Sequence, residues 1–196
     1  MPTGVSLRDA DERLFGAAER VLLRDGPSGL TSRAVTDEAG VAKGVLHRHF
    51  ADFDEFLAGL VHDRAARLEL WSSALLGSAG TGTVAGNLAE ALASVLGSVA
   101  VAMVALITSR DELRRRLRET WPAGVPLLAE IGHTTRAYLL AERDLGRIAP
   151  EADIGPLALA LLGTSHLMFA DRTGRPPAAA DVRAVVEGVL AGALRG

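Results

Sequence analysis

The chain has 196 residues, which is enough for one domain or for a small head joined to a larger body. Its formal net charge of −3 excludes a broadly basic surface, so any contact with nucleic acid would depend on locally placed charges. The absence of cysteine excludes disulfides, thiolate chemistry and zinc fingers.

The first expected element is a helix that starts near Ser6. Ser6 and Asp9 have the spacing of a capping box, and apolar residues then recur at helical spacing until Gly26 and Pro27 stop them. Residues 1–25 lack the continuous apolar core of a signal peptide, so we expect a cytoplasmic protein.

Two short helices are expected next. The second begins near Thr31, a favourable amino-terminal cap, and the third covers about 41–50. Gly40 lies between them and permits a sharp turn, so the pattern predicts a helix-turn-helix. The third helix carries the only lysine of the chain, Lys43, and two of its five histidines.

Basic side chains share one face of this third helix. At 100° per residue, Lys43, Gly44, His47 and Arg48 form one arc, while Leu46 points the other way. A helix fits the major groove, where Lys and Arg donate to guanine. Composition alone leaves open a merely solvated basic face.

A long helix is expected from about Phe53 to the glycine-rich stretch 77–86. The glycines there match neither a dinucleotide-binding motif nor a P-loop, so we expect a flexible interhelical loop. Residues 91–109 are nineteen residues without a charge, but serine, glycine and threonine interrupt them. We therefore expect buried core in two helices and no membrane contact.

The rest of the chain also has helical periodicity. Helices are expected at about 84–97, 99–109, 111–119, 125–144, 154–171 and 180–194. No β-branched alternation is long enough for a sheet, so the fold class is all-α. The arginine-rich stretch 110–118 could be a second nucleic-acid patch, but its interspersed acids favour a charge-paired surface helix.

Three stretches of the head resemble the TetR family, the tetracycline-repressor-like bacterial transcription regulators. They are 13–26, Thr31-Ser32-Arg33-Ala34-Val35-Thr36 and 39–50, which is Ala-Gly-Val-Ala-Lys-Gly-Val-Leu-His-Arg-His-Phe. The resemblance implies a three-helix DNA-binding head, 1–52, and a helical body, 53–196, for effector binding and dimerisation. It also implies a repressor that leaves its operator when a ligand binds.

The residues implied to contact double-stranded DNA lie in the second and third helices. They are Thr31, Ser32, Arg33, Ala42, Lys43, Gly44, Val45, His47, Arg48 and His49. Ala42, Val45 and His47 stand where the family commonly has hydroxyls, which removes hydrogen bonds to phosphates or bases. Histidine titrates near neutrality, so we expect tighter operator binding below about pH 6.5. His49 could equally be a structural residue packed against the first helix.

Two apolar stripes in the last helices predict a homodimer through an intersubunit four-helix bundle. Their residues are Leu157, Leu161, Ser165, Met168, Val182, Val185, Val186, Val189 and Leu190. The alternative is that both stripes are internal core. A two-fold dimer implies a palindromic operator.

The resemblance also implies an effector pocket in the body. Its expected lining is Trp71, Met103, Leu106, Trp121, Leu128, His133 and Tyr138. Because 91–109 carries no charge, we expect a small, largely apolar effector of unknown identity, held by few polar groups such as His133, Thr134 or Ser98.

Other functions compete with this interpretation. The chain could be a small-molecule-binding protein whose DNA affinity is weakened, or a small all-α enzyme. We expect no enzyme: metal-binding, serine-elbow and cysteine-nucleophile motifs are absent from the sequence, and the five histidines lack ligand spacing. We accordingly expect no catalytic residue, no metal and no cofactor.

Overall fold

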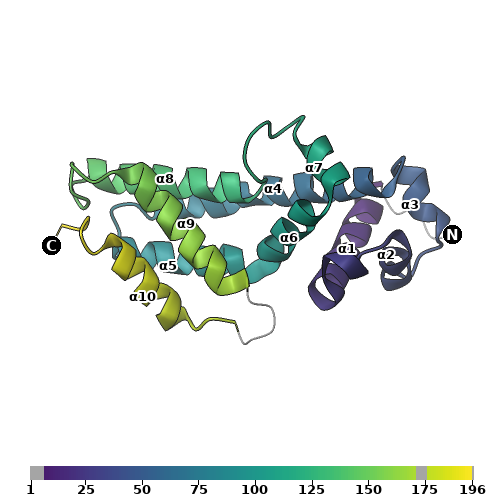
Figure 1. The fold of residues 1–196 in the computed structure, drawn as a ribbon, viewed down its shortest axis with the longest axis horizontal. Coiled ribbons are helices and arrows are strands. Elements are labelled where there is room, and N and C mark those ends of the chain that lie inside the picture. Colours follow the sequence, from purple (N-terminus) through teal and green to yellow (C-terminus); the bar gives the residue numbers. More distant parts are fainter. Residues whose placement is uncertain (1–6, 171–175, 196) are drawn as a thin grey trace. The chain divides into compact units, whose positions relative to one another are not determined.

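The computed structural model describes residues 7–170 and 176–195, and within them all regular structure is helical. The only pairing of strand type in these ranges is one isolated bridge between Ile148 and Leu194. The expected all-α fold class is confirmed. The helices follow one another as Figure 1 labels them.

Packing divides the chain into two compact units. The first unit consists of Met1–Asp63 and Ala102–Ala123, and the second of Arg64–Val101 and Gly124–Gly196. The start of the fourth helix and residues 102–123 thus pack with the helix-turn-helix. The functional division into a DNA-binding part, 1–52, and an effector-binding part, 53–196, stays a prediction.

The first unit begins with three helices, α1 (Leu7–Gly29), α2 (Ser32–Ala39) and α3 (Gly44–His49). Gly26 breaks α1 with φ 73°, directly before Pro27, as the sequence predicts. Thr31 caps α2, and Gly40 ends it in the left-handed conformation with φ 63°. Helix α3 is shorter than expected, because residues 41–43 form the turn that precedes it.

An aromatic cluster joins these helices to α4 (Phe53–Gly77). The ring of Phe56 lies 5.5 Å from that of Phe15 in α1 and 5.2 Å from that of Phe50, which follows α3. Leu46 of α3 is fully buried. The face of α3 opposite to Leu46 is therefore fixed outward.

Helices α6 (Val101–Ser109) and α7 (Asp111–Leu117) follow later in the chain. At the ends of α7, Arg110 pairs with Asp54 at 2.8 Å, and Arg116 pairs with Asp52 at 2.5 Å. Within α7, Arg114 and Arg115 pair with acids three residues earlier. The expected charge-paired helix is confirmed, and its arginines hold the start of α4.

The second unit contains α5 (Val84–Val95), the π-helical segment η1 (Leu96–Ala100), α8 (Leu128–Asp144), α9 (Ile154–Ala170) and α10 (Ala179–Leu190). Helix α9 packs against α8 and α10, and α10 against α5 (Figure 1). Their facing apolar side chains form one core.

The uncharged stretch is one long apolar run, Val84–Ser109, interrupted by the π-helical segment. By length and composition alone it is the one candidate membrane span among the described residues, and 56% of its most apolar window is buried inside the protein. Ser98 breaks the helix with ψ −162°, and its hydroxyl donates to the carbonyl of Val95. Two buried helices were expected here, and the break separates α5 from α6.

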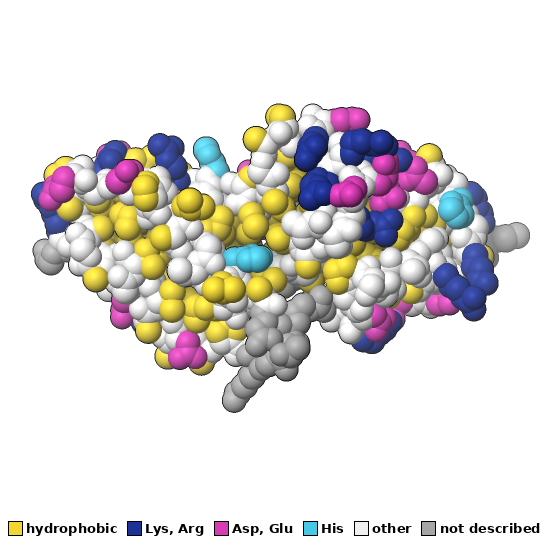
Figure 2. Space-filling view, in the orientation of Figure 1, with side chains coloured by type: hydrophobic (Ala, Val, Ile, Leu, Met, Phe, Trp, Pro, Cys, Tyr) yellow, Lys and Arg dark blue, Asp and Glu magenta, His cyan; other side chains and the backbone are white. Residues whose placement is uncertain are grey.

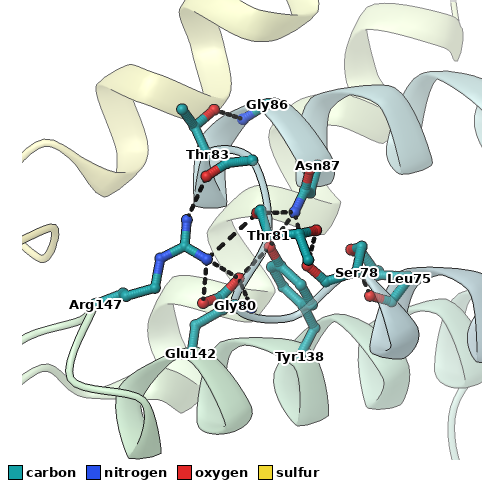
Figure 3. Close-up of polar contacts among 11 residues, drawn as sticks. Leu75, Ser78, Gly80, Thr81, Thr83, Gly86, Asn87, Tyr138, Glu142 and Arg147 are labelled. Carbon is teal, nitrogen blue, oxygen red and sulfur yellow. Dashed lines mark hydrogen bonds and ion pairs between the residues drawn. The ribbon is translucent and has the colours of Figure 1, made fainter.

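The glycine-rich loop between α4 and α5 is tied to α8 by buried polar groups (Figure 3). Glu142 is fully buried; its Oε1 accepts from the hydroxyl of Tyr138 at 2.6 Å and from the backbone N–H of Gly80 at 3.3 Å. Arg147 pairs with Glu142 at 3.1 Å and donates to the carbonyl of Gly82 at 2.6 Å. A flexible loop was expected from the glycines, but these bonds hold it.

Candidate nucleic-acid interface

One surface of the head gathers the basic side chains of α3. Lys43, His47 and Arg48 are exposed, and within the described residues neither Lys43 nor Arg48 makes a hydrogen bond or an ion pair. Figure 2 shows Lys, Arg and His side chains on this part of the head. Cations without an internal partner are free to meet phosphates or base edges.

Helices α2 and α3 together enclose a shallow hollow of about 350 Å³. Its lining is Ser32, Arg33, Thr36, Lys43, Gly44 and His47. A side chain at Gly44 would meet nothing within 4 Å, so the start of α3 is open to a close approach. Five of the ten expected DNA-contacting residues thus surround one concave surface.

Thr36 lines the same hollow and was missed in the sequence. It is buried, and its hydroxyl donates to the carbonyl of Arg33 at 3.0 Å. Its position one helical turn after Ser32 and Arg33 could have placed it on that face.

Arg33 and Thr31 extend the surface along the start of α2. The side chain of Arg33 is 76% exposed and lies 3.5 Å from Asp37, one turn further along α2. Thr31 is exposed, and its Oγ1 accepts from the N–H of Ala34 at 3.1 Å. Its hydroxyl hydrogen is therefore left to donate outward.

The other expected residues differ in exposure. Ala42 is exposed, and Val45 is half-buried. His49 points back to α1, where its Nδ1 lies 3.1 Å from Oδ1 of Asp11. This contact favours the structural role for His49, whereas His47 lies at the open hollow.

Contacts from α1 hold α2 in place beneath this surface. Arg13 donates to the carbonyl of Ala39 at 3.0 Å, and Glu38 accepts from Arg20 at 2.7 Å and from Arg24 at 2.8 Å. The hydrogen bonds from Arg20 and Arg24 lower the pKa of Glu38. Arginines of α1 thus neutralise Glu38, and the hollow itself is lined by the basic side chains of Arg33 and Lys43 and by no acid.

The residues expected to form the dimer interface differ in how far the chain itself buries them. Leu161, Ser165, Val182, Val186 and Leu190 are buried in the second unit, and Leu157, Met168, Val185 and Val189 are half-buried. The physical reason is that α9 and α10 pack on each other and on α8 and α5. These five residues are therefore covered by helices of the same chain, and the dimer interface stays a prediction.

The residues expected to line an effector pocket do not all belong to one unit. Met103, Leu106 and Trp121 lie in the first unit, where the ring of Trp121 is 4.8 Å from that of His62. Trp71, Leu128, His133 and Tyr138 lie in the second.

Within the second unit, these residues differ in burial. Tyr138 is fully buried, whereas His133 is exposed. Burial and the hydrogen bond to Glu142 raise the pKa of Tyr138. Thr134 and Ser72 share a hydrogen bond of 2.5 Å, so two further polar groups are committed internally.

Residues 14–60 match the family model described as bacterial regulatory proteins, tetR family. A search of curated proteins found no match. The match covers α2, α3 and the aromatic cluster described above, and it confirms the resemblance seen in the sequence.

Solved structures share the fold over nearly the whole chain. A TetR-family regulator from Mesorhizobium loti is 16% identical, with 98% of this chain and 100% of that chain covered and a TM-score of 0.73. A transcriptional regulator from Rhodococcus sp. Rha1 is 25% identical, with 93% and 97% covered and a TM-score of 0.69. The regulator FadR from Bacillus subtilis, solved in complex with stearoyl-CoA, is 18% identical, with 92% and 98% covered and a TM-score of 0.69.

Proposed function

We propose that this chain, a TetR-family regulator, is a cytoplasmic homodimeric repressor that leaves a palindromic operator when a small, largely apolar effector binds its body. The observation that carries the proposal is the open hollow between α2 and α3, which Lys43 and His47 line, with Arg48 also exposed on α3. Residues 1–62 hold seven Lys or Arg against ten Asp or Glu, so attraction to DNA is confined to this surface.

The start of α3 is suited to the major groove. Gly44 leaves room for the edge of a base pair, and Lys43 and Arg48 supply donors on either side. Arg33 and the hydroxyl of Thr31, at the start of α2, are placed to contact phosphates. The fixed packing of Leu46 and Phe50 keeps this face turned outward.

For the dimer, the exposed face of α9 supports an interface. Leu159 is 72% exposed and Leu167 is 73% exposed, and Gly163 lies between them at four-residue spacing. A side chain at Gly163 or at Gly188 of α10 would meet nothing within 4 Å, so both helices allow a close approach. Figure 2 shows hydrophobic side chains over this part of the body. Large exposed apolar side chains beside small residues favour helix–helix association.

For the effector, the shared fold supports a ligand site in the body, since the similar FadR structure holds stearoyl-CoA. A ligand can release DNA only by binding better to a body shape whose two heads do not match the operator half-sites. Helix α4 contributes residues to both units, and Arg110 and Arg116 hold its start. Helix α4 is therefore the element expected to transmit the effect of ligand binding to the head.

The test is a mobility-shift assay with the DNA that flanks the gene of this protein. Lys43→Ala and Arg48→Ala should each weaken binding by about tenfold or more, because each loses a contact worth about 1–3 kcal/mol. Arg136→Ala is the matched control, since Arg136 is an exposed arginine on α8 of the body.

Equal affinity of the wild type and the double variant Lys43→Ala/Arg48→Ala would contradict the proposed interface. A wild type that shifts no fragment but still binds a small molecule would favour a ligand-binding protein with weakened DNA affinity. Turnover of a substrate would favour an enzyme.

A further inference from the structure

A groove of about 300 Å³ runs along the hairpin of α4 and α5 in the second unit. Trp71, Ala74 and Leu75 of α4 line one wall, and Asn87, Glu90 and Ser94 of α5 line the other. Trp71 is three residues from Ala74 and four from Leu75, and the residues of α5 are three or four apart, so each set occupies one helical face. Its volume is at the lower end of the range for small-molecule sites, about 300–1,000 Å³.

The N–H and O–H donors on the walls of this groove are mostly committed to the protein. Nε1 of Trp71 donates to the carbonyl of Ala91 at 2.9 Å, and the hydroxyl of Ser78 donates to the carbonyl of Leu75 at 2.7 Å. Nδ2 of Asn87 donates to the carbonyl of Thr81 at 2.9 Å and to the hydroxyl of Tyr138 at 3.1 Å. A ligand that needs several donors, such as a carboxylate or a phosphate, finds few here.

The acceptors of the groove, in contrast, are free. Glu90 is exposed, and in the part of the chain that the structure describes its carboxylate makes no hydrogen bond or ion pair. Oδ1 of Asn87 accepts no hydrogen bond from the described residues either. The groove therefore combines an apolar wall with a single uncompensated negative charge.

We infer that this groove binds a small organic monocation with an apolar body. The ammonium or equivalent N–H group donates to Glu90 and to Oδ1 of Asn87, and the apolar part lies along Trp71 and Leu75. The half-buried indole of Trp71 adds attraction between a cation and an aromatic face. A neutral ligand of the same shape gains only the apolar contact, and an anion is repelled.

This inference deepens the proposed function, because it names the chemical class of the effector. The inferred ligand differs from a purely apolar effector because it must carry one positive charge. Its test measures binding without DNA, so it can fail while the DNA interface holds.

The experiment is calorimetry on the full chain with 4-phenylbutylammonium as the probe. The neutral alcohol 4-phenylbutanol and the anion 5-phenylpentanoate are its isosteric comparisons. We expect the ammonium to bind more tightly than the alcohol, and the carboxylate to bind least. Glu90→Gln should lower the affinity for the ammonium by about fivefold, because an ion pair open to solvent contributes little. The affinity for the alcohol should stay unchanged.

Two variants locate the site. Glu151→Gln is the matched control, since Glu151 is an exposed glutamate of the same unit outside the groove, and it should change nothing. Ala74→Leu places a larger side chain in the groove from an exposed position, so it should weaken binding of the ammonium and of the alcohol equally. Circular dichroism confirms that each variant is folded.

Equal affinity for the ammonium and the alcohol would overturn the inference. So would an equal loss of ammonium affinity in Glu90→Gln and in Glu151→Gln. Tightest binding by the carboxylate would overturn it too. If the ammonium binds through Glu90 but leaves the DNA complex intact, the ligand class stands and the effector role in the proposed function fails.

Discussion

The head and the body use their polar side chains in opposite ways. In the head, Lys43, His47 and Arg48 are exposed, with Lys43 and His47 at an open hollow, whereas arginines of α1 make internal contacts with α2. In the body, Tyr138, Glu142 and Arg147 turn inward and fix the loop between α4 and α5 (Figure 3). Polar side chains are thus left exposed in the first unit and committed to internal contacts in the second.

A free hydrogen-bonding group is therefore better evidence of a site than the residue type alone. Tyr138 was expected to line the effector pocket, and its hydroxyl donates to Glu142 and accepts from Asn87. No sequence motif contains Glu90, yet its carboxylate is exposed at a groove.

The largest expected effect is on the stability of the body. Arg147→Met removes the ion-pair partner of Glu142, which stays buried. Because an unpaired buried charge is costly, the free energy of unfolding should fall by about 3 kcal/mol, while DNA affinity at a temperature where the protein is folded stays unchanged. Urea denaturation and a mobility shift measure the two. A stable Arg147→Met variant with impaired DNA binding would break the contrast between the two units.

A smaller loss of unfolding free energy is expected from Tyr138→Phe, which deletes the hydroxyl that donates to Glu142 without changing the packing of the ring. The cost should be about 1–2 kcal/mol, because Glu142 loses one hydrogen bond in a buried site. The pKa of Tyr138 is raised in the folded state, so its contribution is present below about pH 10 and is lost above it. Denaturation at pH 8 and pH 11 should show a smaller alkaline loss in the variant than in the wild type.

In the head, Ala42→Ser restores a hydroxyl at an exposed position. We expect DNA binding about threefold to tenfold tighter, the effect of one added hydrogen bond, and unchanged stability. The slope of log affinity against log salt should stay the same, because the hydroxyl carries no charge, whereas Lys43→Ala should make it shallower. Titrations at several salt concentrations measure both. Unchanged affinity in Ala42→Ser would place position 42 away from the DNA.

The smallest effect is expected at acid pH. Hydrogen bonds from Arg20 and Arg24 lower the pKa of Glu38, and the pKa of Asp52 is lowered mainly by the backbone N–H of Glu55 and then by Arg116. Carboxyls with a depressed folded pKa stabilise the protein above their unfolded values and lose this contribution as the pH falls. Stability should therefore be level from pH 7 to about pH 5 and fall below about pH 4. The melting temperature of the double variant Glu38→Gln/Asp52→Asn should fall less at acid pH than that of the wild type. Identical melting profiles would contradict a stabilising role for these two carboxylates.

Local signals in the sequence were sufficient for the helices and for the head. Thr31, Gly26 and Gly40 act on their immediate neighbours through capping and backbone conformation, so the ends of α1 and α2 followed from them. The order of residues 39–50 placed Leu46 inside and Lys43 and Arg48 outside, because a single short helix determines both faces.

The sequence could not predict which helices cover the apolar stripes of α9 and α10. Periodicity in α9 and α10 marks a buried face, but the same pattern results whether the covering helix belongs to one chain or to two. For Leu161, Val182 and Val186 the covering helices are in the same chain, whereas Leu159 and Leu167 of α9 are exposed large apolar side chains.

The sequence alone was enough to predict an all-α chain with a basic third helix, because helix periodicity, caps and the spacing of 39–50 act over a few residues. Tertiary structure decided which polar groups remain free. The loop between α4 and α5 is held by residues from α8 and beyond, and the hollow of the head takes Thr36 from α2 as well as Gly44 from α3. Contacts between segments distant in sequence leave no local pattern, and so Glu90 and its groove emerged only from the packed molecule.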